Sequence, residues 1–302
     1  MQYEITKLTF GEHPVIDISR EEYDGAKVAK RNLLEVLSIE QKMNLILENY
    51  VEFERELLNS SLNSMMFYHH DWSSSVGEIH LINRRLMNLL ATCWLYRDQI
   101  RPSFKSIYGS DDEVMQEHYR RLTADFGYRV GEQLRNHIQH RNLPIRRITH
   151  DASRQEDKFG RRIRHTVALH LDVNRLKEDE RFNRSVLKEI EGLGDSTDVK
   201  SLIRQYIESI GRVHLFVRDL LAEDVAAWEN TVSQILDRYR GASNGEVLSI
   251  AVVARNDSGR IAESIQIFED VIERRRWLTQ KNQILTHFSS HIVTSELQHS
   301  NN

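Results

Sequence analysis

Apolar side chains recur every three or four positions along most of the first half of the chain. This is the spacing of one face of an α-helix, so the pattern predicts long amphipathic helices. Two stripes follow one another, and they comprise Met43, Ile46, Leu47, Tyr50, Phe53, Leu57, Leu58 and Met65, then Val76, Ile79, Ile82, Leu86, Leu89, Cys93, Ile100 and Phe104. A shorter helix is expected before them, over about residues 22–37. We therefore predict an antiparallel helical bundle for the N-terminal half.

A further helix is predicted over about residues 111–141. Asp111 and Asp112 offer acceptors that suit the first turn of a helix. The apolar face that follows comprises Met115, Tyr119, Leu122, Phe126, Val130 and Leu134. Pro144 lacks a backbone N–H and its ring clashes with the preceding turn, so the helix is expected to end shortly before it.

Beyond Pro144 apolar and polar positions alternate, which indicates β-strands. Strands are expected over about residues 148–152 and 163–173, within a first hairpin over about 146–173. A second hairpin is expected over about 246–268, where the sequence Asn256-Asp257-Ser258-Gly259 suits a turn. Between the hairpins, a long apolar stripe predicts helix over about residues 198–240, either continuous or divided in two.

These elements together predict a mainly α fold. It is an α-rich α+β protein with an N-terminal antiparallel helical bundle, two β-hairpins and long helices in the C-terminal half. The change of pattern at Pro144 divides the chain into a helical domain over residues 1–143 and an α/β region over residues 144–302, which either packs back onto the first or stands apart. The length of 302 residues and the 40% hydrophobic content are sufficient for such cores.

The composition argues against several classes of protein. The single cysteine, Cys93, lies among leucines, so we expect a buried reduced thiol and no disulfide framework. The chain has no run of about eighteen uncharged apolar residues, and its polar start lacks the hydrophobic segment of a secretory signal. We expect a cytoplasmic protein that does not cross a membrane. Common zinc, di-iron and nucleotide-binding motifs are missing from the sequence, so neither a metal nor a cofactor is expected.

The formal net charge of −4 argues against general attraction to nucleic acid, but basic residues are concentrated locally. Residues 129–164 contain ten arginines and lysines and only four acidic residues. This concentration is a candidate RNA-binding surface, for which we select Arg141, Arg146, Arg147, Arg161 and Arg162. The alternative is a hairpin whose charged faces are simply exposed to water.

The stretch Arg135-Asn136-His137-Ile138-Gln139-His140 carries the strongest chemical signal. RNA can be cleaved without a metal when its 2′-hydroxyl attacks the neighbouring phosphate. Histidine can transfer the proton near neutral pH, so His140 is the candidate for that role. A guanidinium stabilises the negative charge that develops on the phosphate, which suggests Arg135. Asn136 would orient the phosphate or the histidine.

The stretch resembles the R-N-x-x-x-H motif of HEPN domains, helical proteins that include many metal-independent endoribonucleases. The resemblance covers the motif and its position near the end of a helix. It implies RNA as substrate, a 2′,3′-cyclic phosphate product and a homodimer whose site forms about a two-fold axis. A role as a toxin with a cognate antitoxin, or in phage defence with a partner, is also implied. One branch of the family carries a tyrosine where this chain has Asn142, so regulation through that tyrosine is not expected.

Helical geometry adds a constraint. At about 100° per residue, Asn136 and His140 share a face, whereas Arg135 lies about 140° away from His140. Either the helix loosens before Pro144, or a second subunit completes the site. In the alternative interpretation, His137 and His140 line a bundle or dimer interface. The chain would then be a non-catalytic RNA- or protein-binding module, or a structural partner subunit.

Two other patterns have weaker chemical support. The sequence His69-His70-Asp71 resembles the metal-binding pair of HD phosphohydrolases, but no further ligand is evident nearby. The sequence Arg274-Arg275-Arg276-Trp277 could stack on nucleic-acid bases, or it could be a core anchor beside a charged face.

Overall fold

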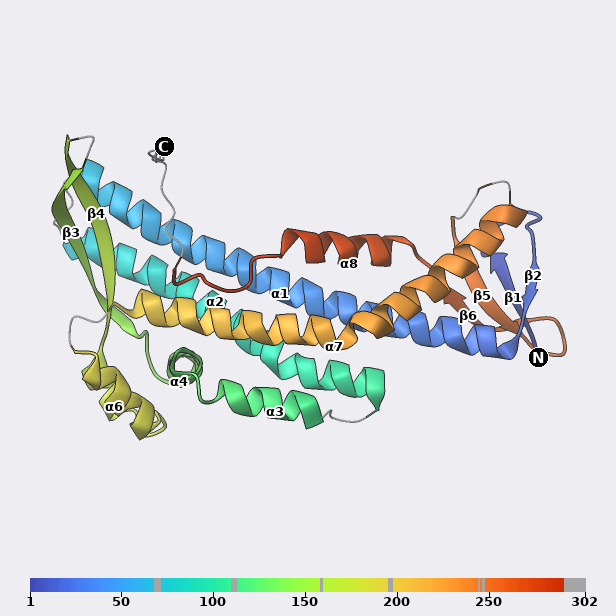
Figure 1. Cartoon of the computed structure of the whole chain (residues 1–302), viewed down its shortest axis with the longest axis horizontal. Helices are drawn as coiled ribbons and strands as arrows, with labels where there is room; N and C mark the ends of the chain where they lie inside the picture. Colours follow the sequence, from blue (N-terminus) through green and yellow to red (C-terminus); the bar gives the residue numbers. More distant parts are fainter. Residues whose placement is uncertain are drawn as a thin grey trace. The chain divides into compact units, whose positions relative to one another are not determined.

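The computed structural model describes residues 1–67, 72–109, 113–157, 160–194, 198–243, 245 and 248–290 (Figure 1). Of these residues, 65% lie in helices and 17% in strands, which confirms the mainly α, α+β fold predicted from the sequence. Within the described part of the chain, no helix is both long and apolar enough to cross a lipid bilayer.

Three long helices dominate the fold: α1 (Arg20–Met66), α2 (Trp72–Tyr108) and α7 (Val199–Ala242). The separate short helix expected over residues 22–37 is in fact the first part of α1. Ser19 and Glu22 begin α1 with a capping box: the Glu22 N–H donates to Ser19 Oγ (3.1 Å), and the Ser19 N–H donates to Glu22 Oε2 (2.7 Å). The stripe over residues 198–240 forms one continuous helix of 44 residues.

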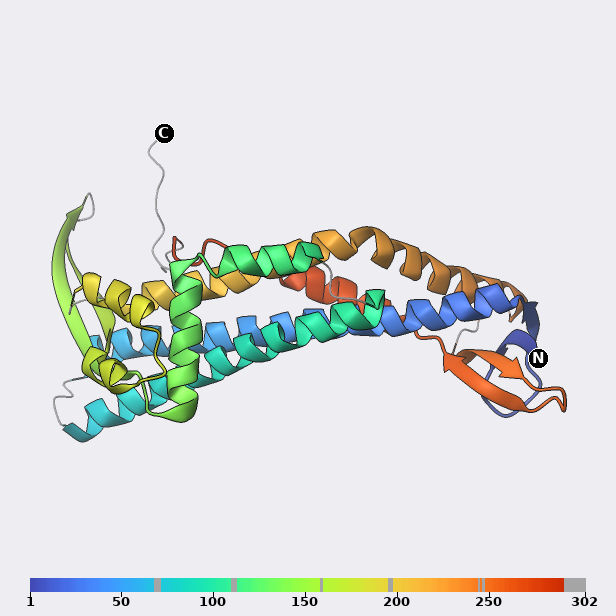
Figure 2. The same cartoon turned by 90° about the horizontal axis from the view of Figure 1, so that it is seen from below.

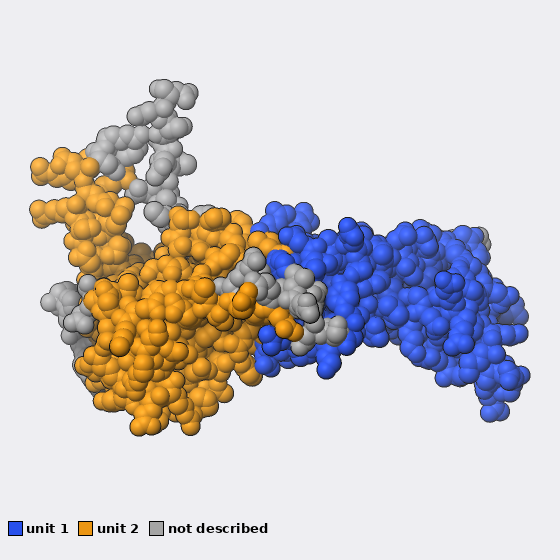
Figure 3. Space-filling view, turned by 60° about the horizontal axis from the view of Figure 1, so that its bottom comes forward, with its two compact units in different colours: residues 1–44, 98–113, 216–283 blue, residues 45–97, 114–215, 284–302 orange. Residues whose placement is uncertain are grey.

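The chain divides into two compact units, coloured separately in Figure 3. Unit 1 comprises residues 1–44, 98–113 and 216–283, and unit 2 comprises residues 45–97, 114–215 and 284–302. Each long helix contributes one part to each unit, so both units draw on both halves of the chain. The boundary expected near Pro144 lies inside unit 2.

Unit 1 contains a four-stranded antiparallel sheet in the order β2-β1-β5-β6. Its strands are β1 (Gln2–Lys7), β2 (Ile16–Ile18), β5 (Ile250–Arg255) and β6 (Ile261–Gln266). The second hairpin is thus present as β5 and β6, and Gly259 takes a positive φ of 73° in its turn. The first two strands were not expected from the sequence. Pairing with β1 makes β5 a central strand, whose residues 250–254 are buried.

Helix α8 (Asp270–Lys281) also belongs to unit 1. Its Arg275 and Arg276 both donate to the buried carboxylate of Glu229. Trp277 is half exposed, with the Arg274 guanidinium 4.2 Å from its ring centroid. Within residues 274–277, two arginines therefore attach α8 to α7, and a third arginine stacks on an exposed aromatic ring.

The first predicted hairpin lies in unit 2 as β3 (Ile145–Asp157) and β4 (Gly160–Leu171). Asn83 fixes its base to α2, because its amide donates to Ile145 O (2.8 Å) and accepts from Ile145 N (3.2 Å). Asp172 caps α5 (Val173–Glu178) and thereby ends the strand. The strand was expected to extend to residue 173, so it ends earlier than predicted. Helix α6 (Arg184–Gly192) follows, capped by Asn183.

The prediction of a single helix over residues 111–141 is wrong in one respect. The structure has two helices there, α3 (Glu113–Leu122) and α4 (Phe126–His140). Asp125 has an extended ψ of 125°, and its carboxylate accepts the Tyr128 N–H at 2.9 Å. This is an N-cap, which starts a new helix at Phe126.

Helix α4 crosses α7 steeply, as Figure 1 and Figure 2 show from two directions. Gly127 and Gly131 make the crossing close, because a Cβ on Gly131 would lie 2.3 Å from the Tyr206 ring and one on Gly127 2.5 Å from Gln205 Cβ. Glu132 fixes the orientation of α4, since it pairs with Arg97 of α2 and accepts a hydrogen bond from the Tyr206 hydroxyl (2.7 Å).

Candidate functional site

The motif residues occupy the last two turns of α4. Leu134 and His137 continue the buried face of this helix, and His137 is only 3% exposed. Asn136 is half-buried and His140 is exposed. The helix ends at His140, where the Arg141 N–H donates to His137 O at 2.9 Å. The helix stays regular to that point, so it does not loosen to bring Arg135 around to His140.

Arg135 lies away from His140. Its guanidinium carbon is 5.1 Å from the ring centroid of Trp94, and its Nη1 donates to Gln139 Oε1 at 2.9 Å. Stacking on the indole and pairing with the next turn of its own helix hold the side chain of Arg135 on the α2 side of α4. The angular separation expected from helical geometry is therefore present in the structure.

His137 forms a buried pair with Asp179, which ends α5. The distance from His137 Nδ1 to Asp179 Oδ2 is 2.8 Å, and Asp179 is only 4% exposed. Because an ionised carboxylate only accepts hydrogen bonds, the pair places a proton on Nδ1. Burial would raise the pKa of Asp179, but hydrogen bonds from His137 and the Arg181 N–H, with the charge of Arg141, hold that pKa below its ordinary value.

The connection from α5 to α6, residues 179–183, is fastened to α4 at both ends. At one end Asp179 accepts from His137 and from the Arg181 N–H at 3.1 Å. At the other end the Asn183 N–H donates to Gln133 Oε1 at 2.9 Å. Between them Phe182 is buried and meets the His137 ring edge-on, with centroids 6.3 Å apart. The backbone of this connection therefore has a defined position against α4.

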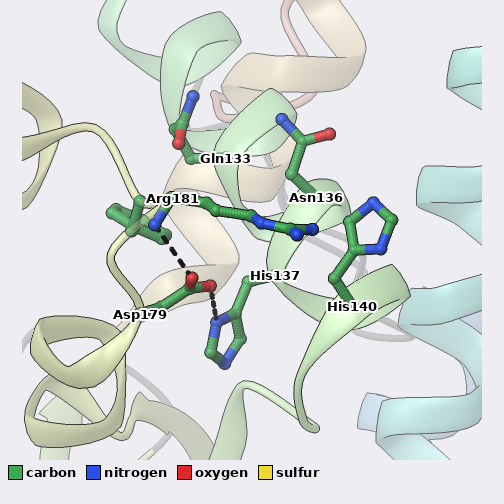
Figure 4. Close-up of a pocket in the computed structure, with 7 residues that line it drawn as sticks. Gln133, Asn136, His137, His140, Asp179 and Arg181 are labelled. Atoms are coloured by element: carbon green, nitrogen blue, oxygen red, sulfur yellow. Dashed lines mark hydrogen bonds and ion pairs between the residues drawn. The ribbon is translucent and has the colours of Figure 1, made fainter.

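A pocket of about 260 Å³ lies between the end of α4 and this connection. Its lining consists of Gln133, Asn136, His137, His140, Asp179, Arg181 and Phe182. In Figure 4 the side chain of Arg181 extends toward those of Asn136 and His140, while His137 turns to Asp179. The structure thus brings the predicted residues Asn136 and His140 together in one pocket with Arg181, and leaves Arg135 outside its lining.

Three side chains of the pocket have no internal polar partner. Within the described part of the chain, no hydrogen bond or ion pair is formed by the Asn136 amide, the His140 imidazole or the Arg181 guanidinium. Most other arginines of unit 2 already form hydrogen bonds or ion pairs within the protein. Arg129, for example, donates two hydrogen bonds of 2.7 and 2.8 Å to Glu189 of α6. The pocket therefore offers an amide, an imidazole and a guanidinium to a ligand.

The five arginines predicted to bind RNA are not gathered on one surface. Arg141 lies 3.7 Å from Asp179 Oδ1, and Arg146 pairs with Asp172 at 2.9 Å. In the ribbon of β3 and β4, the register places Arg147 and Arg162 on one face and Arg161 on the other. All but the half-buried Arg162 are exposed, which also fits the alternative of a hairpin with solvated charged faces.

The sequence pattern did not identify Asp179, Arg181 or the part played by Gln133. The only local signal was the cap at Asn183, which marks the start of α6 but does not place it against α4. The alternative interpretation placed both His137 and His140 at an interface; His137 is buried in the structure, whereas His140 is exposed. His69, His70 and Asp71 lie outside the described residues. Among the residues that are described, no three histidine, cysteine, aspartate or glutamate side chains gather as they would around a metal ion.

Comparison of the chain with protein family models, with curated proteins and with solved structures found no match. The side chains of the pocket themselves indicate which chemistry the site can perform. An imidazole can move a proton, a guanidinium can bind two phosphate oxygens, and an amide can donate to one and accept from a hydroxyl. These groups together suit a phosphodiester.

Proposed function

We propose that the pocket at the end of α4 binds a phosphodiester of RNA and cleaves it without a metal ion, in the manner of the HEPN endoribonucleases that the motif resembles. The observation that carries the proposal is the placement of Asn136 and His140: both line one pocket, and neither side chain has a polar partner among the described residues. Polar groups that are left uncommitted in a concave site are available to a ligand.

In the proposed reaction His140 takes the proton of the 2′-hydroxyl as its oxygen attacks the adjacent phosphorus. The bond from O2′ to phosphorus forms while the bond from phosphorus to O5′ breaks. A water molecule donates a proton to the leaving 5′-oxygen, and the hydroxide that results takes up the proton held by His140. The products are a 2′,3′-cyclic phosphate and a 5′-hydroxyl end. Asn136, one turn before His140, donates its amide to a nonbridging oxygen. His137 is committed to Asp179, so its part is to support the pocket.

The exposed arginines of the hairpin would guide RNA by contacts with its phosphates. Such contacts are independent of sequence and weaken as salt increases. The family resemblance extends the proposal to a homodimer that acts in the cytoplasm as a toxin or a defence effector, together with an antitoxin or another partner.

The test is cleavage of mixed single-stranded RNAs by the purified protein in EDTA, with His140→Ala beside the wild type. Loss of general base catalysis lowers rates by about 100- to 10,000-fold, and we expect His140→Ala to lose activity in that range. His80→Ala, which removes an exposed histidine of α2, is the matched control and should cleave normally. Mass spectrometry should find cyclic phosphate ends. Activity that disappears with EDTA, or that survives in His140→Ala, contradicts the proposal.

A second candidate is a non-catalytic RNA- or protein-binding module. The observation that favours it is the burial of His137, which shows one motif histidine serving the fold. This candidate predicts binding of RNA without any cleavage product. It also predicts that His140→Ala changes the sedimentation of a dimer if the motif residues form an interface.

A further inference from the structure

The proposed function requires a group that carries positive charge to the phosphate, and the motif's own arginine does not lie in the pocket. Arg135 is stacked on Trp94 and bonded to Gln139. We infer that Arg181, from the connection between α5 and α6, is the residue that binds the nonbridging phosphate oxygens in this pocket. The inference rests on the proposed function, because it names the anion-binding residue of the same site.

The first support is the direction and freedom of the side chain. Arg181 extends toward Asn136 and His140 (Figure 4), and its side chain lines the same pocket as the imidazole that would move the proton. Across the described residues, no carboxylate or carbonyl accepts a hydrogen bond from that guanidinium. A planar guanidinium with its donors uncommitted can bind two oxygens of one phosphate at once.

The second support is the way in which the backbone of Arg181 is held. Its N–H donates to Asp179 Oδ1 at 3.1 Å, while the other oxygen of that carboxylate is 2.8 Å from His137 Nδ1. Two residues later, the Asn183 N–H donates to Gln133 Oε1. His137 and Gln133 both belong to α4, the helix that carries His140. A group whose backbone is fixed on the same support as the proton-transfer residue needs little reorganisation when substrate binds.

The neighbouring arginines lack this combination of features. Arg129 is bonded twice to Glu189, Arg146 pairs with Asp172, and Arg141 approaches the Asp179 carboxylate at 3.7 Å. None of these three lines the pocket. Arg181 therefore takes the phosphate-binding role that the motif assigns to Arg135. The anion site is formed by two segments of one chain, the end of α4 and the connection between α5 and α6.

The experiment measures binding separately from cleavage. A fluorescein-labelled single-stranded RNA with 2′-O-methyl riboses cannot be cleaved by 2′-hydroxyl attack, and its anisotropy reports the dissociation constant. Arg181→Ala should weaken binding by about 10- to 100-fold, because a charge-assisted bidentate contact is lost. Arg181→Lys should recover part of the affinity, since it restores the charge without the paired donors.

Arg184→Ala is the matched control. It removes the same charge three residues away, from a side chain that donates to Lys177 O and does not line the pocket. We expect it to bind within about threefold of the wild type, as expected for a charge outside the site. Circular dichroism and thermal unfolding verify that each variant is folded. Because Arg181 is exposed, its replacement should leave the fold intact.

The outcomes separate this inference from the proposed function. If the wild type binds the methylated RNA, Arg181→Ala does not, and natural RNA is never cleaved, the anion site stands and the ribonuclease proposal fails. If the wild type cleaves RNA and Arg181→Ala cleaves it with unchanged kcat and KM, the ribonuclease proposal stands and the inference fails. Equal binding by the Arg181→Ala and Arg184→Ala variants also overturns the inference, as does a wild type that does not bind RNA.

Discussion

Replacement of Asp179 by alanine is the sharpest test of how the pocket is built. The substitution removes the acceptor of the His137 Nδ1 proton and of the Arg181 N–H, at 2.8 and 3.1 Å. His137 is 3% exposed, and its Nε2 already has no partner in the part of the chain that the structure describes. The variant therefore leaves a buried imidazole with no hydrogen bond on either nitrogen.

The expected loss of stability follows from these two contacts. A buried polar group without a partner costs about 1–3 kcal/mol, and the lost bond to the Arg181 N–H adds about 1 kcal/mol. We therefore expect Asp179→Ala to lower the free energy of unfolding of unit 2 by about 2–4 kcal/mol. With a urea m value of about 3 kcal/mol/M, the midpoint would fall by about 1 M.

The assay is urea unfolding followed by tryptophan fluorescence. Trp228 and Trp277 belong to unit 1, so replacing them and Trp72 by phenylalanine leaves Trp94 of α2 to report on unit 2. A double-mutant cycle with His137→Leu isolates the pair, because that change removes the imidazole that Asp179→Ala leaves unpaired. The double variant should be more stable than the sum of the two single effects predicts, by about 1–2 kcal/mol. Effects that add to within about 0.5 kcal/mol would refute the pairing.

The pH dependence of Asp179→Asn tests the charge of the same carboxyl group. The folded pKa of Asp179 lies below its ordinary value, so the ionised form stabilises the fold. That contribution is fully present above the unfolded pKa of about 3.9 and is lost as the pH falls through the lower folded value. The stability difference between wild type and Asp179→Asn should therefore be constant near pH 5 and shrink below about pH 4. A difference that grows as the pH falls would contradict this sign.

Two further substitutions test the packing that positions the site and the fold. Gly131→Ala should destabilise unit 2 by about 1–3 kcal/mol in the same urea assay, since its Cβ would lie 2.3 Å from the Tyr206 ring. Gly77→Ala is its control and should be neutral or stabilising, because an added Cβ would meet no packing neighbour within 4 Å. In unit 1, Glu40→Ala should cost about 3–5 kcal/mol, because Arg218 would lose both bonds to that carboxylate, of 2.8 and 2.7 Å. Retained stability in Glu40→Ala would show that the ion pair is not needed.

Local pattern was enough to predict much of the architecture. The apolar spacing predicted α2 and the helical character of α1 and α7, although α1 was expected as two helices and α7 as either one or two. The alternation after Pro144 predicted the ribbon of β3 and β4. These predictions succeed because a helix or a hairpin makes its hydrogen bonds within one stretch of chain, and because its buried face follows from the period of its side chains. The break at Asp125 was missed, since the apolar stripe continues across it at nearly helical spacing.

The pairing of strands that are far apart in the sequence could not be predicted from the local pattern. Strand β1 pairs with β5, so that Gln2 lies opposite Arg255, and nothing in the short N-terminal segment identifies that distant partner. The two glycines of α4 let another helix approach closely. Their spacing of one turn did not say which helix would approach, because that choice depends on the Tyr206 ring and its neighbours.

The sequence by itself determined that Asn136 and His140 share one face at the end of a helix, and that Arg135 cannot join them. Only the tertiary structure decided which cationic side chain lies in the pocket with Asn136 and His140. The folding of residues 179–183 against α4 buries Asp179 with His137 and turns Arg181 toward His140 (Figure 4). Helical periodicity fixes the angles between residues of one helix. The contacts of a segment from elsewhere in the chain depend on packing, and packing is settled only when the whole unit folds.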